Sequence, residues 1–432
     1  MVSFKGGVHP PEEKGLTASK GIETPPLPKR VIIPFSQHTG APSKPIVKKG
    51  DEVKTGEKIG EIQGKISVPT HATISGKVLD IKEFPHPVLG SRSLACIIES
   101  DGKDEWISRE EREDYLNLSP SQLIEIVKEA GIVGLGGAAF PTHIKLSPPK
   151  DKPIDTLIIN GCECEPYLTA DHRLMLENTE GILKGAEILK RILNPKRVII
   201  AIEDNKPDAI EKMEKSAKGF EVIKLKTKYP EGAEKQLIYA LTRREVPSGG
   251  LPMDVGCLVQ NVGTTLAVYE AVRFSKPLIE RVLTVTGDGI REPKNLRVRI
   301  GTPIKDLIDV CGGYREPPAK VILGGPMMGL AQYSDELPVV KGTSGILILT
   351  PKTAEVPQEG PCLRCARCVD ACPMNLLPCE IAKFIEHREF SKARDYGVLD
   401  CIECGCCAYV CPSKIRLVHL FKFGKSEIRR LG

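Results

Sequence analysis

Eight cysteines near the end of the chain have the spacing of ligands to iron–sulfur clusters. The segment from Cys362 reads C-L-R-C-A-R-C-V-D-A-C-P, and the segment from Cys401 reads C-I-E-C-G-C-C-A-Y-V-C-P. In both, the proline stops the chain from continuing as a helix after the last ligand. In proteins with two such runs, the fourth cysteine binds the cluster of the other run. The spacing therefore predicts two [4Fe–4S] clusters, one held by Cys362, Cys365, Cys368 and Cys411 and one by Cys401, Cys404, Cys407 and Cys372.

Zinc and disulfide bonds are the alternatives for these cysteines. Structural zinc sites generally use two separated pairs of ligands, whereas this chain has two runs of four. Disulfide frameworks belong to small secreted domains, and the first ten residues lack the apolar segment of a signal peptide. Cys406 lies beside the ligand assigned to Cys407, and the spacing of the first run favours Cys407. We predict that most of the remaining cysteines are small buried apolar side chains; these are Cys96, Cys162, Cys164, Cys257, Cys311, Cys379 and Cys406.

Composition excludes several classes of protein. The 432 residues are 41% hydrophobic and 27% charged, and the net charge is only +5. Because the lysines and arginines are spread along the chain, a nucleic-acid partner is not expected. No apolar run reaches the roughly 18 residues of a transmembrane helix. The sequence therefore predicts a protein without a transmembrane segment, either cytosolic or bound at a membrane surface.

The chain begins with an arm and a β-rich region. Residues 1–30 are rich in proline, glycine and lysine, which predicts an extended arm lying over another surface. Short alternating strands with glycine turns follow. The string G-D-E-V-K-T-G and the later S-G-K-V resemble the biotinyl/lipoyl type of barrel-sandwich domain. Lys65 lies nearest the position of a modified lysine in that family, but its neighbours differ, and we predict a solvated side chain.

The middle of the chain alternates strands and helices. Ser119 and Pro120 are typical of a helix start, and Gly131 of its end. Alternation of this kind predicts a parallel sheet covered on both faces. The expected strands are 156–160, 197–202 and 220–225, and the expected helices are 169–193, 206–217, 231–243 and 263–273.

Two smaller regions complete the expected architecture. From Arg281 the order of strand, turn, strand and short helix resembles the soluble-ligand-binding β-grasp domain, and Gly325-Pro326 predicts a fixed loop near the preceding domain. The cysteine runs flank a helical stretch, which predicts a helical ferredoxin domain. The predicted fold is thus multidomain α/β, with an arm and barrel-sandwich over 1–115, a Rossmann-like α/β domain over 116–275, a β-grasp domain over 276–350 and the cluster domain over 351–432.

The glycine loop at residues 134–145, G-L-G-G-A-A-F-P-T-H-I-K, suggests a phosphate contact. Glycines let a backbone approach phosphate closely, and a helix N-terminus favours negative charge. The loop follows a predicted helix rather than a strand, so it lacks the context of a Rossmann fingerprint. From the residues alone, a helix stop followed by a turn is an equally good interpretation.

Four motifs resemble the NADH- and FMN-binding subunit of respiratory complex I, in that family's order. The glycine loop is similar to its G-R-G-G-A-G-F-P-T-G-L-K, and N-G-C-E-C-E-P at 160–166 to its N-x-D-E-S-E-P. Y-P-E-G-A-E at 229–234 resembles Y-x-x-G-E-E, and Q-N-V-G-T-T-L-A at 260–267 resembles N-N-V-E-T-L-A. Jointly they imply a site for non-covalent FMN and for NAD(H) as substrate.

The resemblance implies a role for each matching residue of the first and last motifs. Backbone N–H groups of the glycine loop would line the nucleotide pocket. Phe140 would stack on the adenine of NADH, and Lys145 would meet FMN or its phosphate. Asn261 and Thr264 would hold the phosphate end of FMN. The loop glycines that carry this expectation are Gly134, Gly136 and Gly137.

The two middle motifs would contact the flavin and the nicotinamide. Asn160 and Glu163 would lie along the flavin, and Glu165 would contact the nicotinamide or its ribose, since carboxylates accept hydrogen bonds from hydroxyls and amides. Tyr229 and Glu234 would border the NADH side. A solvated loop after a strand is the alternative for the two glutamates of the second motif. No acid–base residue is expected, because the cofactors carry the electron transfer.

Over its whole length the chain resembles the C subunit of the Rnf complex, through F-K-G-G-V-H-P, I-N-G-C-E-C-E-P-Y and G-G-P-M-M-G. The resemblance implies an oxidoreductase subunit that exchanges electrons between ferredoxin and NAD in an ion-translocating complex. Its partners would be integral membrane subunits and a ferredoxin-like iron–sulfur subunit, on the cytoplasmic side of the plasma membrane. A soluble flavin and iron–sulfur cobalamin reductase, and a cluster-only wiring subunit that binds no nucleotide, remain the alternatives.

Overall fold

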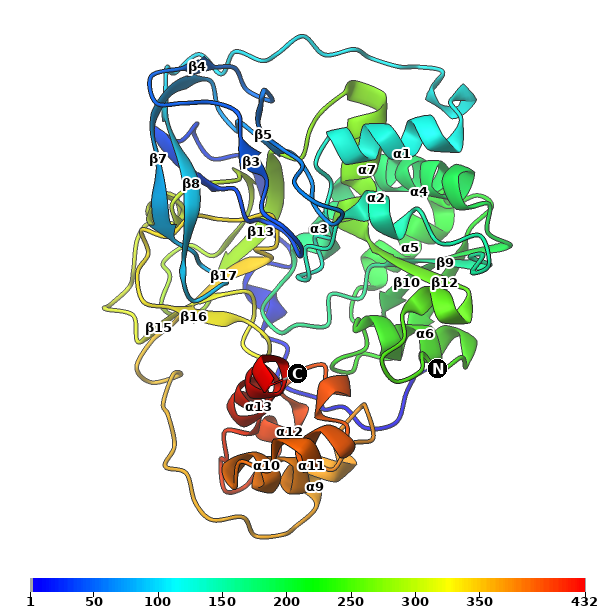
Figure 1. The fold of residues 1–432 in the computed structure, drawn as a ribbon, viewed down its shortest axis with the longest axis vertical. Helices are drawn as coiled ribbons and strands as arrows, with labels where there is room; N and C mark the ends of the chain where they lie inside the picture. The colour runs from blue at the N-terminus through cyan, green and yellow to red at the C-terminus, as the bar shows by residue number, and fades with distance from the viewer. Residues whose placement is uncertain (1–2, 432) are drawn as a thin grey trace.

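The computed structural model describes residues 3–431, so residues 1, 2 and 432 of the predicted first and last domains lie outside it. Figure 1 shows a β-rich lobe beside an α/β lobe, with the helices of the C-terminal region below both. Among the described residues, no helix has the length and apolar character needed to span a membrane.

The barrel-sandwich region consists of two small antiparallel sheets. One has the order β2-β8-β7-β4 and the other β3-β5-β6. Side chains such as Val31, Phe35 and Ile98 fill the space between the sheets. Lys65 is exposed, in the loop between β5 and β6. The strands are β2 Arg30–Pro34, β3 Lys44–Pro45, β4 Glu52–Val53, β5 Lys58–Glu61, β6 Thr70–His71, β7 Gly76–Pro85 and β8 Arg92–Ser100.

The α/β region contains a four-stranded sheet in the order β11-β10-β9-β12, with all neighbouring strands parallel. Strands β9, β10 and β12 are almost entirely buried, as expected for a sheet covered by helices, whereas the edge strand β11 has two exposed and two half-buried residues. The strands are β9 Thr156–Asn160, β10 Arg197–Glu203, β11 Glu221–Leu225 and β12 Cys257–Asn261. The sequence did not predict β12, because its residues C-L-V-Q-N have only two aliphatic side chains in a row, against three in T-L-I-I-N of β9.

Helices surround this sheet. Ser119 caps the first with a reciprocal capping box to Gln122, which confirms the predicted start. The single helix predicted over 169–193 is wrong: the structure has two helices that meet at Asn178, whose backbone is not helical. The helices are α1 Pro120–Glu129, α2 Thr142–Lys145, α3 Ala170–Glu177, α4 Thr179–Leu193, α5 Pro207–Ser216, α6 Glu234–Thr242 and α7 Val262–Phe274.

The β-grasp region is built on a six-stranded mixed sheet with the order β1-β14-β13-β17-β15-β16. Strand β1, Ile22–Glu23, comes from the N-terminal arm and pairs in parallel with β14. The other elements are β13 Glu280–Thr286, β14 Lys294–Arg299, α8 Ile304–Val310, β15 Lys320–Leu323, β16 Leu330–Gln332 and β17 Gly345–Leu349.

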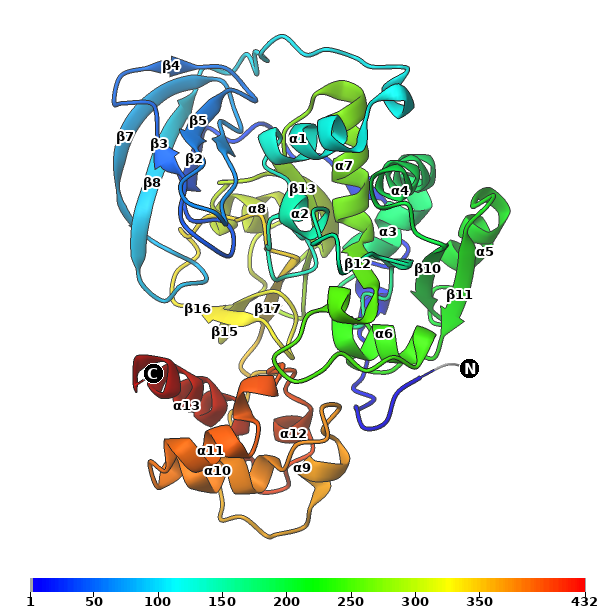
Figure 2. The ribbon, with the colours of Figure 1, turned by 45° about the vertical axis from the view of Figure 1, so that its right-hand side comes forward.

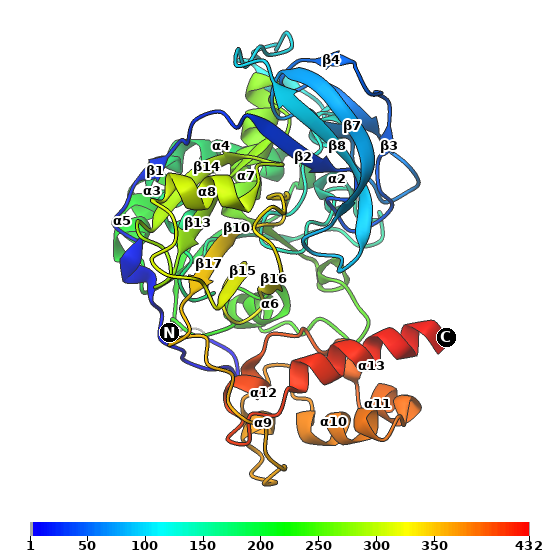
Figure 3. The ribbon, with the colours of Figure 1, turned by 90° about the vertical axis from the view of Figure 1, so that its left-hand side faces the viewer.

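The cluster region is helical, as predicted. Ile381, Ile385, Leu417 and Phe421 form its core, where α10 packs against α13. Figure 3 shows α13 below the α/β and β-grasp regions and above α10 and α11, with its C-terminal end pointing away from the molecule. The helices are α9 Arg367–Asp370, α10 Pro378–Glu386, α11 Phe390–Asp395, α12 Cys406–Tyr409 and α13 Leu417–Leu431.

The N-terminal arm is extended, but it lies on this chain's own domains. In Figure 2 the blue arm leaves the N-terminus, passes between the cluster region and the α/β region, and continues upward. The N–H of Gly7 donates to the carbonyl of Ala371, 2.9 Å away, and Val8 forms a bridge with Tyr229. The short 3-10 helices η1 Lys14–Leu16, η2 Tyr115–Asn117, η3 Pro252–Val255 and η4 Val398–Asp400 complete the structure.

Candidate nucleotide and iron–sulfur sites

The carboxyl edge of the parallel sheet brings two of the predicted motifs together. Asn160 ends β9 and Asn261 ends β12, and the two residues are direct partners in the strand register. The Asn261 Oδ1 accepts from the N–H groups of Gly263 and Thr264 at 2.9 and 3.2 Å, so it caps α7. Ligands of open α/β sheets bind at this edge. The predicted FMN residues thus lie where the fold places a ligand.

The glycine loop contacts the start of α7. The N–H of Leu135 donates to the Oγ1 of Thr264 at 2.8 Å. A Cβ on Gly136 would lie 3.5 Å from the Cβ of Asn261, so the two backbones are close. Gly137 is exposed, has a φ of +111°, and a Cβ there would meet nothing within 4 Å. The exposed glycine backbone beside a helix N-terminus therefore fits a phosphate group.

Lys145 lies close to a residue of another predicted motif. Its Nζ donates to the Oε1 of Glu234 and to the carbonyl of Val259, both at 2.7 Å. Phe140 is half-buried on the segment before α2. Phe140 and Glu234 are both expected on the NADH side. Phe140 lies in the 134–145 segment itself, and Glu234 contacts the end of that segment through Lys145. The ammonium of Lys145 already has two protein acceptors.

Asn160 and Glu163 have structural partners of their own. The Asn160 side chain donates to the carbonyl of Gly232 at 2.9 Å and accepts from the N–H of Cys162 at 3.1 Å. The Glu163 carboxylate accepts from the N–H groups of Asp171 and His172 at 2.8 and 3.0 Å. Glu163 therefore binds the N-terminal end of α3, where the helix dipole favours a negative charge.

The Glu165 carboxylate contacts the β-grasp region. Its Oε1 accepts from the N–H groups of Met327 and Met328 at 2.7 and 3.0 Å. A Cβ on Gly325 would lie 2.1 Å from the Cγ of Glu165, so only glycine allows this approach. Burial raises the pKa of Glu165, and the two amides oppose that shift. The contact confirms the expected fixed loop at Gly325-Pro326, while the nicotinamide role of Glu165 stays a prediction.

Tyr229 joins the nucleotide edge to the cluster region. Its side chain is buried, and its hydroxyl donates to the carbonyl of Cys404 at 2.8 Å. Burial raises the pKa of this hydroxyl, with the nearby Glu165 and Cys164 adding to the effect. The predicted NADH-side tyrosine is therefore also a contact to the second cysteine run.

Asp171 is a residue that the sequence did not single out. Its Oδ2 accepts from the Nδ2 of Asn261 at 2.7 Å, and burial followed by the charge of Glu163 raises its pKa to about 7. Two further residues, Lys14 and Lys206, contact the loop after β9. Lys206 could have been identified from the sequence, because it lies in a charged run directly after β10, at the ligand-binding edge. No sequence pattern identifies Lys14 as a contact of this loop.

The second predicted set of cysteines surrounds one cavity. Its lining residues include all four expected ligands, together with the apolar side chains of Leu376, Val418 and Phe421. Within residues 3–431, no three His, Cys, Asp or Glu side chains lie close enough to hold a single metal ion. A cube binds each thiolate at a different iron atom, so its ligands stand farther apart than those of one ion. The residues that fit the cluster are Cys372, Cys401, Cys404 and Cys407.

The first predicted set is placed differently. Cys362 and Cys365 are exposed on the segment before α9, Cys368 is half-buried, and Cys411 is buried. The thiol of Cys379 is a neighbour of Cys368. The assignment of this set therefore rests on its spacing and stays a prediction.

Family comparisons match every region of the chain. Residues 2–103 match the family described as RnfC barrel sandwich hybrid domain, and residues 127–270 match the Nuo51 FMN-binding domain. Residues 282–331 match the SLBB domain, and residues 361–415 match the 4Fe-4S dicluster domain. The fold and its sites thus define a flavin and iron–sulfur electron-transfer protein.

Relatives define the family more narrowly. The chain is 51% identical to the C subunit of the proton-translocating ferredoxin:NAD(+) oxidoreductase complex of Clostridium ljungdahlii, over 100% of this chain and 95% of that protein. It is 46% identical to the C subunit of the Na(+)-translocating ferredoxin:NAD(+) oxidoreductase complex of Acetobacterium woodii, over 100% and 98%. The chain belongs to the family of the C subunits of these ion-translocating Rnf complexes.

A solved structure shows a similar fold. The crystal structure of NAD+-reducing [NiFe]-hydrogenase in the H2-reduced state matches with a TM-score of 0.53 and 17% identity, over 73% of this chain and 61% of that chain. At this identity the likeness concerns the fold alone.

Proposed function

We propose that this chain is the subunit of a ferredoxin:NAD+ oxidoreductase complex that exchanges electrons with NAD(H), in a complex whose other members translocate ions. The observation that carries the proposal is the contact of Tyr229 with Cys404, because it joins the nucleotide edge to the cavity of the second cysteine set. Bound FMN supplies the conversion between a two-electron hydride step and single-electron steps. The relatives' names carry different ions, so the proposal does not specify one.

The residues of this chain would position the cofactors. The exposed backbone of Gly136 and Gly137 lies beside the start of α7, where an FMN phosphate would bind. Asn261 already accepts from the first N–H groups of that helix. Asn160 and Tyr229 would form one wall of the site. Cys372, Cys404 and Cys407 are buried and Cys401 is half-buried, so a cluster held by this set would lie largely within protein.

We infer partners and a location from the family. The relatives are members of multi-subunit complexes, so other Rnf subunits are expected to bind this chain. We place it at the cytoplasmic side of the membrane, bound through integral subunits. Release from washed membranes by high salt, without detergent, would support this location, whereas a requirement for detergent would contradict it.

The main proposal is tested on the anaerobically purified chain supplied with FMN. We expect the flavin and cluster absorbance bands to bleach together when NADH is added. Clusters that bleach with dithionite but not with NADH, in a preparation that binds no FMN, would contradict the proposal and favour a cluster-only wiring subunit. The match to an FMN-binding domain and the relatives' identities disfavour that alternative and the cobalamin reductase.

A further inference from the structure

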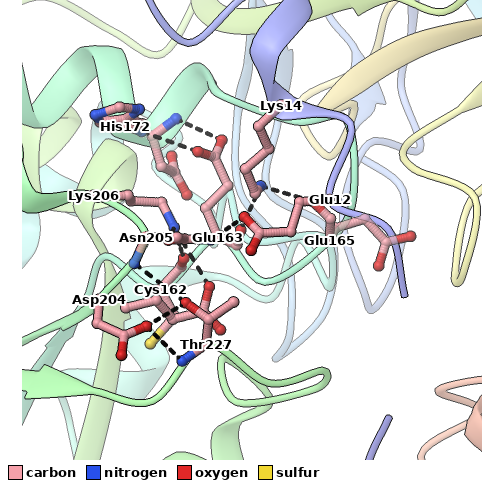
Figure 4. Close-up of polar contacts among 12 residues, drawn as sticks. Glu12, Lys14, Cys162, Glu163, Glu165, His172, Asp204, Asn205, Lys206 and Thr227 are labelled. Carbon is pink, nitrogen blue, oxygen red and sulfur yellow. Dashed lines mark hydrogen bonds and ion pairs between the residues drawn. The ribbon is translucent and has the colours of Figure 1, made fainter. Parts of the chain in front are cut away.

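The loop between β9 and α3, residues 161–168, carries the predicted glutamates and has no regular secondary structure. Two lysines from distant parts of the chain bind its carbonyl groups (Figure 4). Carbonyls in such a loop have no helix or strand partner, and buried carbonyls need a donor. The donors therefore decide the conformation of the loop.

Lys14 binds three of these carbonyls. Its Nζ lies 2.8 Å from the carbonyl oxygen of Glu163, 2.9 Å from that of Glu165 and 2.6 Å from that of Leu168. An ammonium has three N–H donors, so Lys14 uses its full donor capacity within the loop. The residue is buried although it belongs to the N-terminal arm, in η1.

Lys206 binds the loop from the opposite side. It is fully buried at the start of α5, and its Nζ donates to the carbonyl of Cys162 at 2.5 Å and to the Oδ1 of Asn205 at 2.7 Å. The carboxylate of Glu203 lies 3.4 Å away and balances its charge. Burial lowers the pKa of Lys14, and the positive charge of Lys206 adds to that shift. Two buried ammonium groups thus donate hydrogen bonds to carbonyl groups of the same loop.

The arm that carries Lys14 also contacts Tyr229 and the second cysteine set. The N–H of Tyr167 donates to the carbonyl of Glu12 at 2.7 Å, so the arm binds the end of the loop as well. Closer to the N-terminus, Val8 pairs with Tyr229, and a Cβ on Gly6 would lie 2.7 Å from the carbonyl oxygen of Cys372. The arm therefore fixes the loop relative to Tyr229 and the second cysteine set.

We propose that Lys14 and Lys206 are positioning residues of the nucleotide site, which order the 161–168 loop through its carbonyl groups before any nucleotide binds. The ordered loop holds the Asn160–Cys162 contact and the Glu163 contact to α3 in the geometry that the nucleotide meets. The proposal rests on the proposed function for the identity of the ligand. The ordering of the loop itself does not depend on it.

Hydrogen exchange on the full chain with its clusters, without added FMN, tests the ordering. Lys14→Met and Lys206→Met should each accelerate exchange at least tenfold in peptides covering 161–172, and leave the strands β9 and β10 unchanged. Lys20→Met is the matched control, because Lys20 lies on the same arm and donates to the carbonyl of Pro293 in the β-grasp region instead. We expect it to behave as the unmodified protein.

Flavin binding provides the second measurement, by quenching of FMN fluorescence. Lys14→Met should weaken FMN binding at least tenfold, and Lys14→Gln, which keeps two N–H donors without the charge, should give an intermediate loss. The iron content should remain that of the unmodified protein. If Lys14→Met does not yield soluble protein, Lys14→Gln and Lys206→Met decide the question by the same two measurements.

Equal exchange and equal FMN affinity in the Lys14 and Lys20 variants would overturn the proposal. Faster exchange throughout the domain would also overturn it, since this would indicate general destabilisation rather than local ordering. If the unmodified protein binds no FMN, the proposed function fails, while local exchange in 161–172 still decides the role of the lysines.

Discussion

The two cysteine runs have the same spacing in the sequence and very different surroundings in the structure. The second run lies under the nucleotide edge, where the carbonyl of Cys404 accepts from the buried Tyr229 and the arm packs alongside. The first run begins with two exposed cysteines on a segment that leaves the β-grasp region. Packing against a neighbouring domain thus makes two equivalent motifs unequal: an inner run near the nucleotide site, and an outer run whose first two cysteines lie near solvent and whose last residues contact the arm.

The difference suggests an order for electron transfer. Because the inner run touches the nucleotide edge, its cluster would exchange electrons with the flavin, and the exposed outer run would exchange them with a partner.

Cys404→Ser and Cys365→Ser should give the largest difference. Each should remove about half of the iron, because each takes one ligand from one cube. In Cys404→Ser we expect NADH to leave the remaining cluster oxidised, while dithionite still reduces it. In Cys365→Ser the inner cluster should still be reduced by NADH. Electron paramagnetic resonance of the reduced clusters distinguishes the two, and equal NADH reduction in both variants would contradict the assigned order.

Asp171→Asn tests the carboxyl group that lies beside Asn261 and Glu163 at the nucleotide edge. The pKa of Asp171 in the folded protein is about 7, above its usual value of 3.8. Between these two pH values the carboxyl is therefore protonated in the folded protein and ionised in the unfolded chain. Stability of the unmodified protein should therefore fall as pH rises through this interval and level off above about pH 7. The difference between these two pKa values corresponds to on the order of 4 kcal/mol in the free energy of unfolding.

The amide that Asp171→Asn introduces cannot titrate, and its oxygen can still accept from Asn261. Urea denaturation at pH 5.5 and pH 8 should therefore show a smaller loss of stability with pH in this variant. An unchanged pH dependence would show that another group dominates the titration.

Tyr229→Phe removes the contact between the nucleotide edge and the inner run. The carbonyl of Cys404 loses its donor in a buried position, which costs about 1–3 kcal/mol. Tyr409→Phe, on the exposed side of α12, is the control and should change stability by less than about 0.5 kcal/mol. Urea midpoints measure both, and equal midpoints would show that the contact does not stabilise the inner run.

Leu363→Ser should have the smallest effect. This outer-run side chain is 65% exposed, so its replacement should alter the free energy of unfolding by less than about 0.5 kcal/mol. NADH-dependent bleaching should also be unchanged. A marked loss of stability would mean that the outer run is packed more tightly than the exposure of Leu363 indicates.

Local patterns predicted much of the architecture. The cap at Ser119, the apolar strand at 156–160 and the helical stretch near Ile381 all depend on residues close together in sequence, and the structure has them. The predictions failed where tertiary contacts decide: β12 gains its partner from β9, and the 169–193 helix breaks at Asn178, where α3 ends and α4 begins.

The candidate site divides along the same line. The cysteine spacing, the glycine loop and the four nucleotide motifs could be recognised in the sequence, because ligand spacing and backbone freedom are properties of neighbouring residues. Only the tertiary structure placed Glu165 against Met327, Lys14 against a loop about 150 residues away, and Tyr229 against Cys404. These contacts join residues far apart in sequence, and burial gives each its strength; no local pattern encodes them.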